Sequence, residues 1–258
     1  MNWPALKALW LPLRSQQQEW LDADDIPARD LHKNLDDLQW LNRYLGSHWL
    51  VLRAFQRLWH GAGCPRYLRV LDVGTGAGDI PELLTRWGRR RGVQLTIVAV
   101  DNHRGVIQYV RSVQRSLSHL TVVQADGVCL PFHARTFDVV VCSTMLHHLD
   151  WPQGIALLHS MAAVARYGVV VNDLVRSRLH YYAARLVLSV VARHHVTRYD
   201  GPLSVLRAYS LEEVREMARL AGLARAHVST ALGYRLVLVY VPPAGVPPAG
   251  VRKATDGG

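Results

Sequence analysis

The chain has 258 residues, of which half are hydrophobic and 19% are charged, and its formal net charge at pH 7 is +10. This length and composition suit one α/β domain with additional elements and exclude an intrinsically disordered chain. Most of the positive charge comes from arginine, so the charge fits either a solvated basic surface or an acidic partner such as nucleic acid.

Cysteine usage and hydropathy predict the cellular compartment of the protein. Cys64, Cys129 and Cys142 form no C-x-x-C pair, so we expect neither a zinc site nor a disulfide framework. The first 18 residues lack the apolar core of a signal peptide, and the most apolar later stretch, Leu179 to Ala192, is short and interrupted by polar residues. We therefore expect a soluble, cytoplasmic protein without a transmembrane segment, whereas peripheral membrane contact stays open.

The first half of the chain changes from helical to alternating character. Residues 1–60 are predicted to form an N-terminal helical cap, because leucines recur at spacings of three, four and seven. A Gly- and Pro-containing break at 61–65 ends this pattern. Five strands are predicted after the break: Tyr67 to Val73, Leu95 to Val100, Leu120 to Gln124, Phe137 to Cys142 and Gly168 to Val171. Continuous apolar strands between helices indicate a parallel sheet covered on both faces.

The second half departs from this alternation. Residues 174–209 are predicted to form a helical insertion, and two β-type runs, Ala226 to Leu232 and Tyr234 to Val241, predict an antiparallel hairpin at the end of the sheet. Residues 242–258 contain a tandem Val-Pro-Pro-Ala-Gly repeat and predict a disordered tail. The main domain is therefore predicted to span residues 61–241.

The strongest motif is Leu71-Asp72-Val73-Gly74-Thr75-Gly76-Ala77-Gly78-Asp79, in which a strand ends, glycines allow a tight turn and a helix begins. Asp101 ends the next predicted strand, where a carboxylate can accept both hydroxyls of a ribose. Asp126-Gly127 follows the third strand and is placed to contact an adenine amino group. Asp79 stands where a dinucleotide-binding loop has its third glycine, and Asp72 precedes the glycines. The loop therefore favours a cationic ligand over the diphosphate of NAD.

These motifs resemble those of the class I S-adenosylmethionine-dependent methyltransferases, and the resemblance covers roughly Leu68 to Val241. It implies an α/β, Rossmann-like fold with helical caps and a seven-stranded, mostly parallel sheet in the order 3-2-1-4-5-7-6, whose last strand is antiparallel. It also implies S-adenosyl-L-methionine as the cofactor. The cofactor-binding residues that it implies are Asp72, Gly74, Thr75, Gly76, Gly78, Asp101, Asn102, Asp126, Gly127 and Ser143.

Three further segments, Leu130-Pro131-Phe132, Phe137-Asp138 and Leu146-His147-His148-Leu149, resemble the small-molecule branch that quinone-biosynthesis methyltransferases typify. That resemblance implies a hydrophobic acceptor, such as a phenol, quinone or polyketide of secondary metabolism, methylated on oxygen or carbon. Ser143-Thr144-Met145-Leu146 stands where amine-methylating relatives carry Asn/Asp-Pro-Pro-aromatic. This departure argues against methylation of DNA bases and against nucleic acid as a partner.

The candidate catalytic residues are His148, His147 and Asp173. Adjacent side chains on a helix point about 100° apart, so at most one histidine is expected to face the acceptor. A histidine with a near-neutral pKa suits removal of a proton from a hydroxyl or enol, and His148 is assigned this role, with packing as the alternative. Asp173 follows the fifth strand and either orients an acceptor hydroxyl or caps a turn. Neither His147-His148 nor His194-His195 has the i,i+4 spacing of helical metal ligands, so we expect no metal.

Three other functions stay open at this stage. The basic charge is compatible with an RNA methyltransferase. An NAD-linked oxidoreductase is disfavoured by the missing third glycine. A cofactor-binding regulatory protein that lacks catalysis would retain the same loop. The sequence leaves the acceptor and the oligomeric state open.

Overall fold

A computed structural model describes residues 12–23, 26–114 and 119–243 of the chain. The strands in these residues are β1 (Tyr67–Val73), β2 (Gln94–Asp101), β3 (Leu120–Gln124), β4 (Phe137–Ser143), β5 (Ala165–Leu174), β6 (His227–Ala231) and β7 (Arg235–Tyr240). They form one sheet in the order β3-β2-β1-β4-β5-β7-β6. Strand β7 runs antiparallel to β5 and β6, and the other neighbours are parallel. The predicted Rossmann-like fold and strand order are confirmed.

Helices flank the sheet and its edges. They are α2 (Ala28–Tyr44), α3 (Ser47–Gly61), α4 (Asp79–Arg91), α5 (Arg104–Val113), α6 (Trp151–Val164), α7 (Arg178–Val191), α8 (His195–Arg207) and α9 (Leu211–Leu220). Three short 3-10 turns, η1 (Trp20–Asp22), η2 (Gly127–Cys129) and η3 (Leu146–His148), complete the described elements. Every helix in the described ranges is too short or too polar to span a lipid bilayer.

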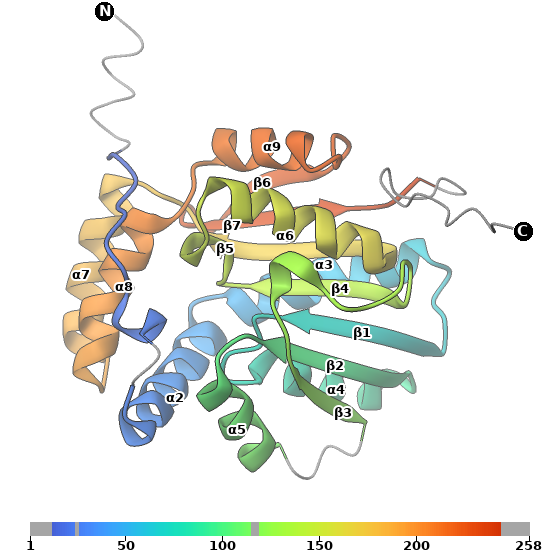
Figure 1. The fold of residues 1–258 in the computed structure, drawn as a ribbon, viewed down its shortest axis with the longest axis horizontal. Helices are drawn as coiled ribbons and strands as arrows, with labels where there is room; N and C mark the ends of the chain where they lie inside the picture. Colours follow the sequence, from blue (N-terminus) through green and yellow to red (C-terminus); the bar gives the residue numbers. More distant parts are fainter. Residues whose placement is uncertain (1–11, 24–25, 115–118, 244–258) are drawn as a thin grey trace, which may run out of the picture.

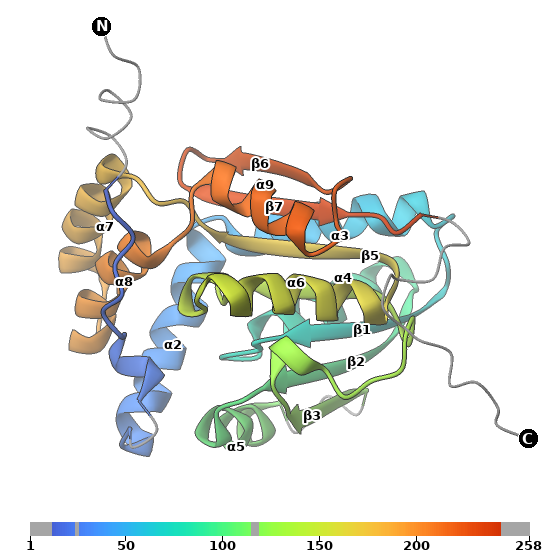
Figure 2. The same ribbon diagram turned by 45° about the horizontal axis from the view of Figure 1, so that its top comes forward.

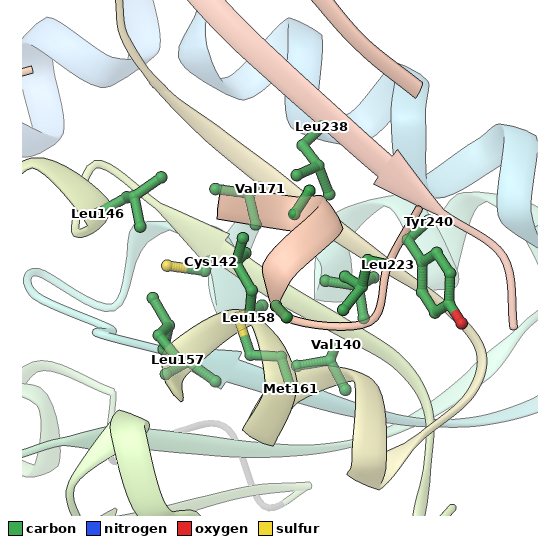
Figure 3. Packing of buried hydrophobic residues seen from close by; sticks show 14 of the residues in the cluster. Val140, Cys142, Leu146, Leu157, Leu158, Met161, Val171, Leu223, Leu238 and Tyr240 are labelled. Carbon is green, nitrogen blue, oxygen red and sulfur yellow. The ribbon is translucent and has the colours of Figure 1, made fainter. Parts of the chain in front are cut away.

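The two faces of the sheet carry separate apolar layers. On one face, Leu157, Leu158 and Met161 of α6 lie among Val140 and Cys142 of β4, and Leu223 after α9 closes the same cluster (Figure 3). On the other face, Phe55 of α3 and Trp87 of α4 pack edge to face with ring centroids 5.1 Å apart. Because both faces are covered, the valines of β4 are fully buried, as their uninterrupted apolar run predicts.

Helix α3 belongs to this core rather than to a separate cap. Its Phe55 and Leu58 share one buried cluster with Val141 of β4 and Val170 of β5. The predicted division at residue 60 therefore does not coincide with a boundary in packing. The predicted tail, 242–258, lies outside the described residues except for its first two.

The N-terminal segment 12–22, here called the strap, corrects the prediction of helices throughout residues 1–60. Residues 12–19 have no regular secondary structure, and within the strap only η1 is helical. The Ser15 N–H donates to the Leu206 carbonyl at 3.0 Å. The run from Ser15 to Gln18 offers no apolar periodicity to form a helix face. Its backbone instead lies along α8 (Figure 1).

Helices α2, α7 and α8 gather at one edge of the molecule. This is the edge to which β1 and β4 point, and both views show the strap crossing it (Figures 1 and 2). Parallel strands bring their carboxyl ends together here, and open α/β sheets bind ligands at such edges. The segment predicted as a helical insertion, 174–209, contributes α7 and α8 to this edge.

We predict that Gly168→Ala destabilises the protein while Gly61→Ala does not. A Cβ at Gly168, in β5, would lie 2.7 Å from the Tyr240 carbonyl oxygen and 2.6 Å from Leu58, whereas a Cβ at Gly61 meets nothing within 4 Å. The overpacking should cost about 1–3 kcal/mol of unfolding free energy. Denaturant unfolding of both variants measures this, and equal stabilities would contradict the packing of α3 and β7 around β5.

Candidate active site

The glycine loop between β1 and α4 is built as its sequence predicts. The backbone N–H groups of Gly74 and Thr75 both donate to the Val100 carbonyl, at 2.9 and 3.0 Å, which ties the loop to β2. Gly74 and Gly76 have φ values of 68° and 49°, which side chains with a Cβ rarely adopt. A Cβ at Gly74 would also lie 2.5 Å from the Met145 sulfur. Two independent constraints therefore require glycine at position 74.

Asp101 joins this loop to the end of β2. Its Oδ2 accepts a hydrogen bond from the Gly76 N–H at 3.1 Å, and its Oδ1 accepts one from the His103 N–H at 3.0 Å. Burial raises the pKa of Asp101, although these two backbone N–H groups oppose the shift. The carboxylate is thus held beside the loop, where the sequence predicts a ribose-binding acid.

A cavity of about 400 Å³ opens over the loop. The predicted cofactor residues that line it are Gly74, Thr75, Gly76, Asp101, Asn102, Gly127 and Ser143, and His148 reaches it as well. Asp72 and Gly78 support the loop without lining the cavity. Asp126 does not line it either, because its carboxylate caps η2 by accepting from the Val128 N–H at 3.0 Å. Contact of Asp126 with adenine stays a prediction.

Charge and unpaired polar atoms decide which cofactor fits. Asp72 is buried with its Oδ2 unpartnered, and burial, together with the charges of Asp79 and Asp101, raises its pKa to about 7. The Thr75 side chain lies beside this carboxyl group, and its hydrogen bond to Asp72 partly opposes the rise in pKa. Three carboxyl groups beside the loop suit a cofactor that carries positive charge and ribose hydroxyls, and they would repel a diphosphate. The residues fit S-adenosylmethionine.

A second cavity, of about 260 Å³, lies under α2, α7 and α8 and is here called the acceptor cavity. Its lining is predominantly apolar and includes Leu41, Leu45 and Leu188. Five residues line both cavities: Leu21, Leu38, Asn42, Thr144 and His148. The two cavities therefore meet, and Thr144 and His148 at the junction follow the end of β4.

His147 and Asp173 form a buried pair in the wall of the acceptor cavity. The distance from His147 Nδ1 to Asp173 Oδ1 is 2.6 Å, and the His147 backbone N–H donates to Oδ2 at 3.1 Å. Burial alone would raise the pKa of Asp173, but the charge of His147 and its hydrogen bond outweigh burial and lower that pKa. An ionised Asp173 fixes Nδ1 as the donor and leaves Nε2 of His147 directed toward Glu19, 3.8 Å away.

His148 lines the acceptor cavity as expected, but His147 lines it too and the charge of His148 differs from the prediction. Both histidines line the acceptor cavity, with ring centroids 4.2 Å apart and an angle of 36° between the ring planes. Burial would lower the pKa of His148, but the carboxylates of Glu19 and Asp22 outweigh burial and raise it to about 9. His148 is therefore an imidazolium at neutral pH, which does not suit the base with a near-neutral pKa that the sequence suggested.

Glu19 and Arg207 are site residues that the sequence did not reveal. Glu19 accepts a hydrogen bond from the Ser204 hydroxyl at 2.8 Å, and its other oxygen lies 3.5 Å from Arg207 Nε. Arg207 also donates to the His148 carbonyl at 2.9 Å. In the sequence, Glu19 is only one acidic residue in a polar segment. No motif there links it to residues 147 and 148.

Glu19, His147 and His148 each offer one ligand atom, and these atoms lie within 4.8 Å of one another. The guanidinium of Arg207 already supplies positive charge at the same carboxylate. The expectation of no metal stays a prediction.

Comparisons with known proteins agree with this geometry. Residues 70–168 match the methyltransferase domain family. This match covers β1 to β5, including the glycine loop and Asp101. This match and the strand order agree with the resemblance to class I S-adenosylmethionine-dependent methyltransferases that the motifs indicate. The cofactor, as the loop chemistry indicates, is S-adenosylmethionine.

The methyltransferase domain has curated relatives in quinone biosynthesis. A ubiquinone/menaquinone biosynthesis C-methyltransferase from Idiomarina loihiensis is 30% identical over 108 residues, which are 39% of this chain and 42% of that protein. A ubiquinone biosynthesis O-methyltransferase from Xanthomonas campestris pv. campestris is 28% identical over 130 residues, 50% of this chain and 51% of that protein. The chain thus spans about half the length of the curated relatives it matches.

The fold also matches solved structures. The plantazolicin methyltransferase BpumL, solved in complex with SAH, aligns with a TM-score of 0.62 over 84% of this chain and 95% of that one, at 12% identity. At that identity the likeness shows the fold of the methyltransferase domain alone.

We predict that Asp101→Ala weakens binding of S-adenosylhomocysteine roughly ten- to a hundredfold, because charge-assisted hydrogen bonds contribute about 1.5–3 kcal/mol. Calorimetric titration measures the dissociation constant. Glu216→Ala removes an exposed carboxylate from α9 and should bind as the wild type does. Unchanged affinity in Asp101→Ala would remove this residue from the cofactor site.

We further predict a pH-dependent stabilisation from His148. Its pKa rises on folding from an ordinary 6.5 to about 9, so the contribution is fully present below pH 6.5 and is lost as the pH rises toward 9. The melting temperature of the wild type should therefore fall more steeply across this window than that of His148→Gln. Parallel curves for the two proteins would contradict the ion pairs of His148 with Glu19 and Asp22.

Proposed function

We propose that the protein transfers the methyl group of S-adenosylmethionine to a hydrophobic small molecule, on the oxygen of a phenol-type hydroxyl or on an activated ring carbon. The observation that carries this proposal is the junction of an apolar acceptor cavity with the cofactor cavity at Thr144 and His148. Apolar walls with a few convergent polar groups suit small-molecule sites. The quinone-biosynthesis names of the curated relatives support the same acceptor class.

The mechanism needs alignment more than chemical activation. When bound, the cofactor supplies a methyl group already activated by its sulfonium charge. The residues of the chain orient the acceptor and exclude water from the junction of the cavities. Leu21, from the strap, and Leu38, from α2, line that junction, so they would form apolar walls around the reacting atoms.

A hydroxyl or enol acceptor must lose a proton as it is methylated. In this proposal His147 Nε2 accepts that proton, because Asp173 holds Nδ1 and its charge stabilises the imidazolium that forms. The imidazolium of His148, at the junction, would donate a hydrogen bond to the developing acceptor oxyanion. The assignment thus exchanges the roles expected from the sequence, with His147 as the base.

The alternatives gain less support. An RNA nucleotide would have to enter a cavity lined by six leucines, two alanines and two valines, and by one cationic side chain that is always charged, Arg235. A regulatory protein would need the cofactor cavity but not the buried His147–Asp173 pair beside the acceptor cavity. A cytoplasmic location fits three cysteines that are all free, and it remains part of the proposal.

We predict that a panel of phenols, hydroquinones, alkylresorcinols and pyrones contains a substrate, detected as a methylated product by mass spectrometry. His147→Gln should lower its turnover about a hundredfold or more, and Asp173→Asn should lower it in the same direction. Affinity for S-adenosylhomocysteine should remain, since neither residue lines the cofactor cavity.

The matched control is His227→Gln, which replaces an exposed histidine on β6. This variant should retain full turnover. Unchanged turnover in His147→Gln would return that residue to a packing role. Methylation of transfer RNA, with every small molecule in the panel refused, would overturn the acceptor class.

A further inference from the structure

Arg235 is a charged residue that neither the fold nor the proposed methyl transfer uses. It is the first residue of β7, where it pairs with Leu174 of β5 and Ala231 of β6. Its side chain lines the acceptor cavity together with Leu174, Thr144 and Tyr234. It is the only arginine or lysine among the described residues that line this cavity.

The guanidinium of Arg235 is buried without a polar partner. The residue is 4% exposed, and its Nε and Nη1 atoms have no hydrogen bond within the described part of the chain. No ion pair of Arg235 occurs among those residues either. The Tyr234 ring centroid lies 5.9 Å from Cζ, and the more distant charges of Asp173 and Asp79 support the guanidinium without a hydrogen bond to it. The other buried arginines of this edge, Arg176 and Arg207, each form several hydrogen bonds and an ion pair.

The two carboxylates whose charges support Arg235 direct their hydrogen bonds to histidines instead. Asp173 is bound by His147 at 2.6 Å, and Asp79 is bound by His48 at 2.6 Å. His180, which lines the same cavity, donates from Nδ1 to the Val175 carbonyl at 2.9 Å. Burial, reinforced by the charge of Arg235, lowers the pKa of His180, which disfavours a second positive charge beside Arg235.

A buried cation without a partner is among the most costly features that a folded protein can contain. Arginine keeps its charge in proteins, so loss of a proton does not relieve the cost. Its planar fork matches the two oxygens of a carboxylate, and low-dielectric walls strengthen such a contact. A carboxylate of a bound ligand would meet the open donors of this fork. The two acids that line the same cavity, Glu19 and Asp200, accept hydrogen bonds from Ser204 and from the backbone of η1 instead.

We propose that Arg235 binds an anionic group of the acceptor, so that the acceptor is a hydrophobic acid rather than a neutral molecule. This inference rests on the proposed function only in identifying the ligand of the cavity as the acceptor. The methionine part of the cofactor also carries a carboxylate. Arg235 lines the acceptor cavity and is absent from the lining of the cofactor cavity, which favours the acceptor as the source of the anion.

The test measures binding rather than turnover. The protein is saturated with S-adenosylhomocysteine and titrated by calorimetry with 4-butylbenzoate and with its methyl ester, which keeps the shape and removes the charge. The wild type should bind the benzoate about ten- to a hundredfold more tightly than the ester. Arg235→Met should lose this preference, and Arg235→Lys, which keeps the charge without the fork, should retain part of it.

Two controls separate this site from general electrostatics and from folding. Arg185→Met removes an exposed arginine from α7 and should keep the full preference despite the same change in net charge. Arg235→Met without ligands should melt at or above the wild-type temperature, because it removes a buried unpaired charge. The comparison of the two probes on the wild type needs no variant and stands even where Arg235→Met does not fold.

Each contrary result overturns the proposal. A wild type that binds benzoate and ester equally has no anion site in the cavity. An unchanged preference in Arg235→Met places the site elsewhere. A tenfold loss of S-adenosylhomocysteine affinity in Arg235→Met, with the benzoate preference intact, assigns Arg235 to the cofactor carboxylate instead. The benzoate preference could be intact and depend on Arg235 while no acceptor is methylated. That result would refute the proposed function and leave the anion site standing.

Discussion

The hydrogen bonds between Asp173 and His147 hold together the edge of the sheet on which the whole site depends. Asp173 follows the last residue of β5 that pairs with β4, and it binds both the backbone and the ring of His147, which follows β4. This fixes η3, and with it the position of His148 at the junction of the two cavities. The pair is buried, so removal of either partner leaves an uncompensated polar group in the interior.

The strap is attached to the same turn. Arg14 donates to the carbonyls of His147 and Leu149 at 2.9 and 2.7 Å, and Arg207 donates to the carbonyl of His148. Carbonyls at the end of a short helix have no partner within it, so these arginines satisfy groups that would otherwise be buried and unpaired. The strap thereby brings Glu19 to the histidines, and the acceptor cavity is closed by a segment more than 120 residues distant in sequence.

The limits of sequence reasoning follow from these distances along the chain. The strands, the glycine loop and Asp101 could be predicted because each depends on local pattern: apolar runs, a strand-to-helix turn, and an acid at the next strand end. The roles of Glu19 and Arg235 could not be predicted, because the residues around them belong to the strap, α8 and the hairpin, which are distant in sequence. The same holds for His148. Its pKa is set by Glu19 and Asp22, which no local motif links to it.

Thr144 shows how the fold holds the junction in place. Its φ is 53°, a conformation that a β-branched residue rarely adopts and that has to be held by its surroundings. The Thr144 N–H donates to the Asn172 carbonyl at 2.8 Å, and the Asn172 side chain binds Ser47 and Ser143 at 2.8 and 3.0 Å. The ends of β4 and β5 and the start of α3 are thus locked by one buried polar network. This network holds the unfavourable backbone conformation of Thr144 at the contact between the cofactor and acceptor cavities. A rigid junction keeps the reacting atoms in line without the cost of ordering them at each turnover. It therefore suits a reaction whose rate depends on alignment.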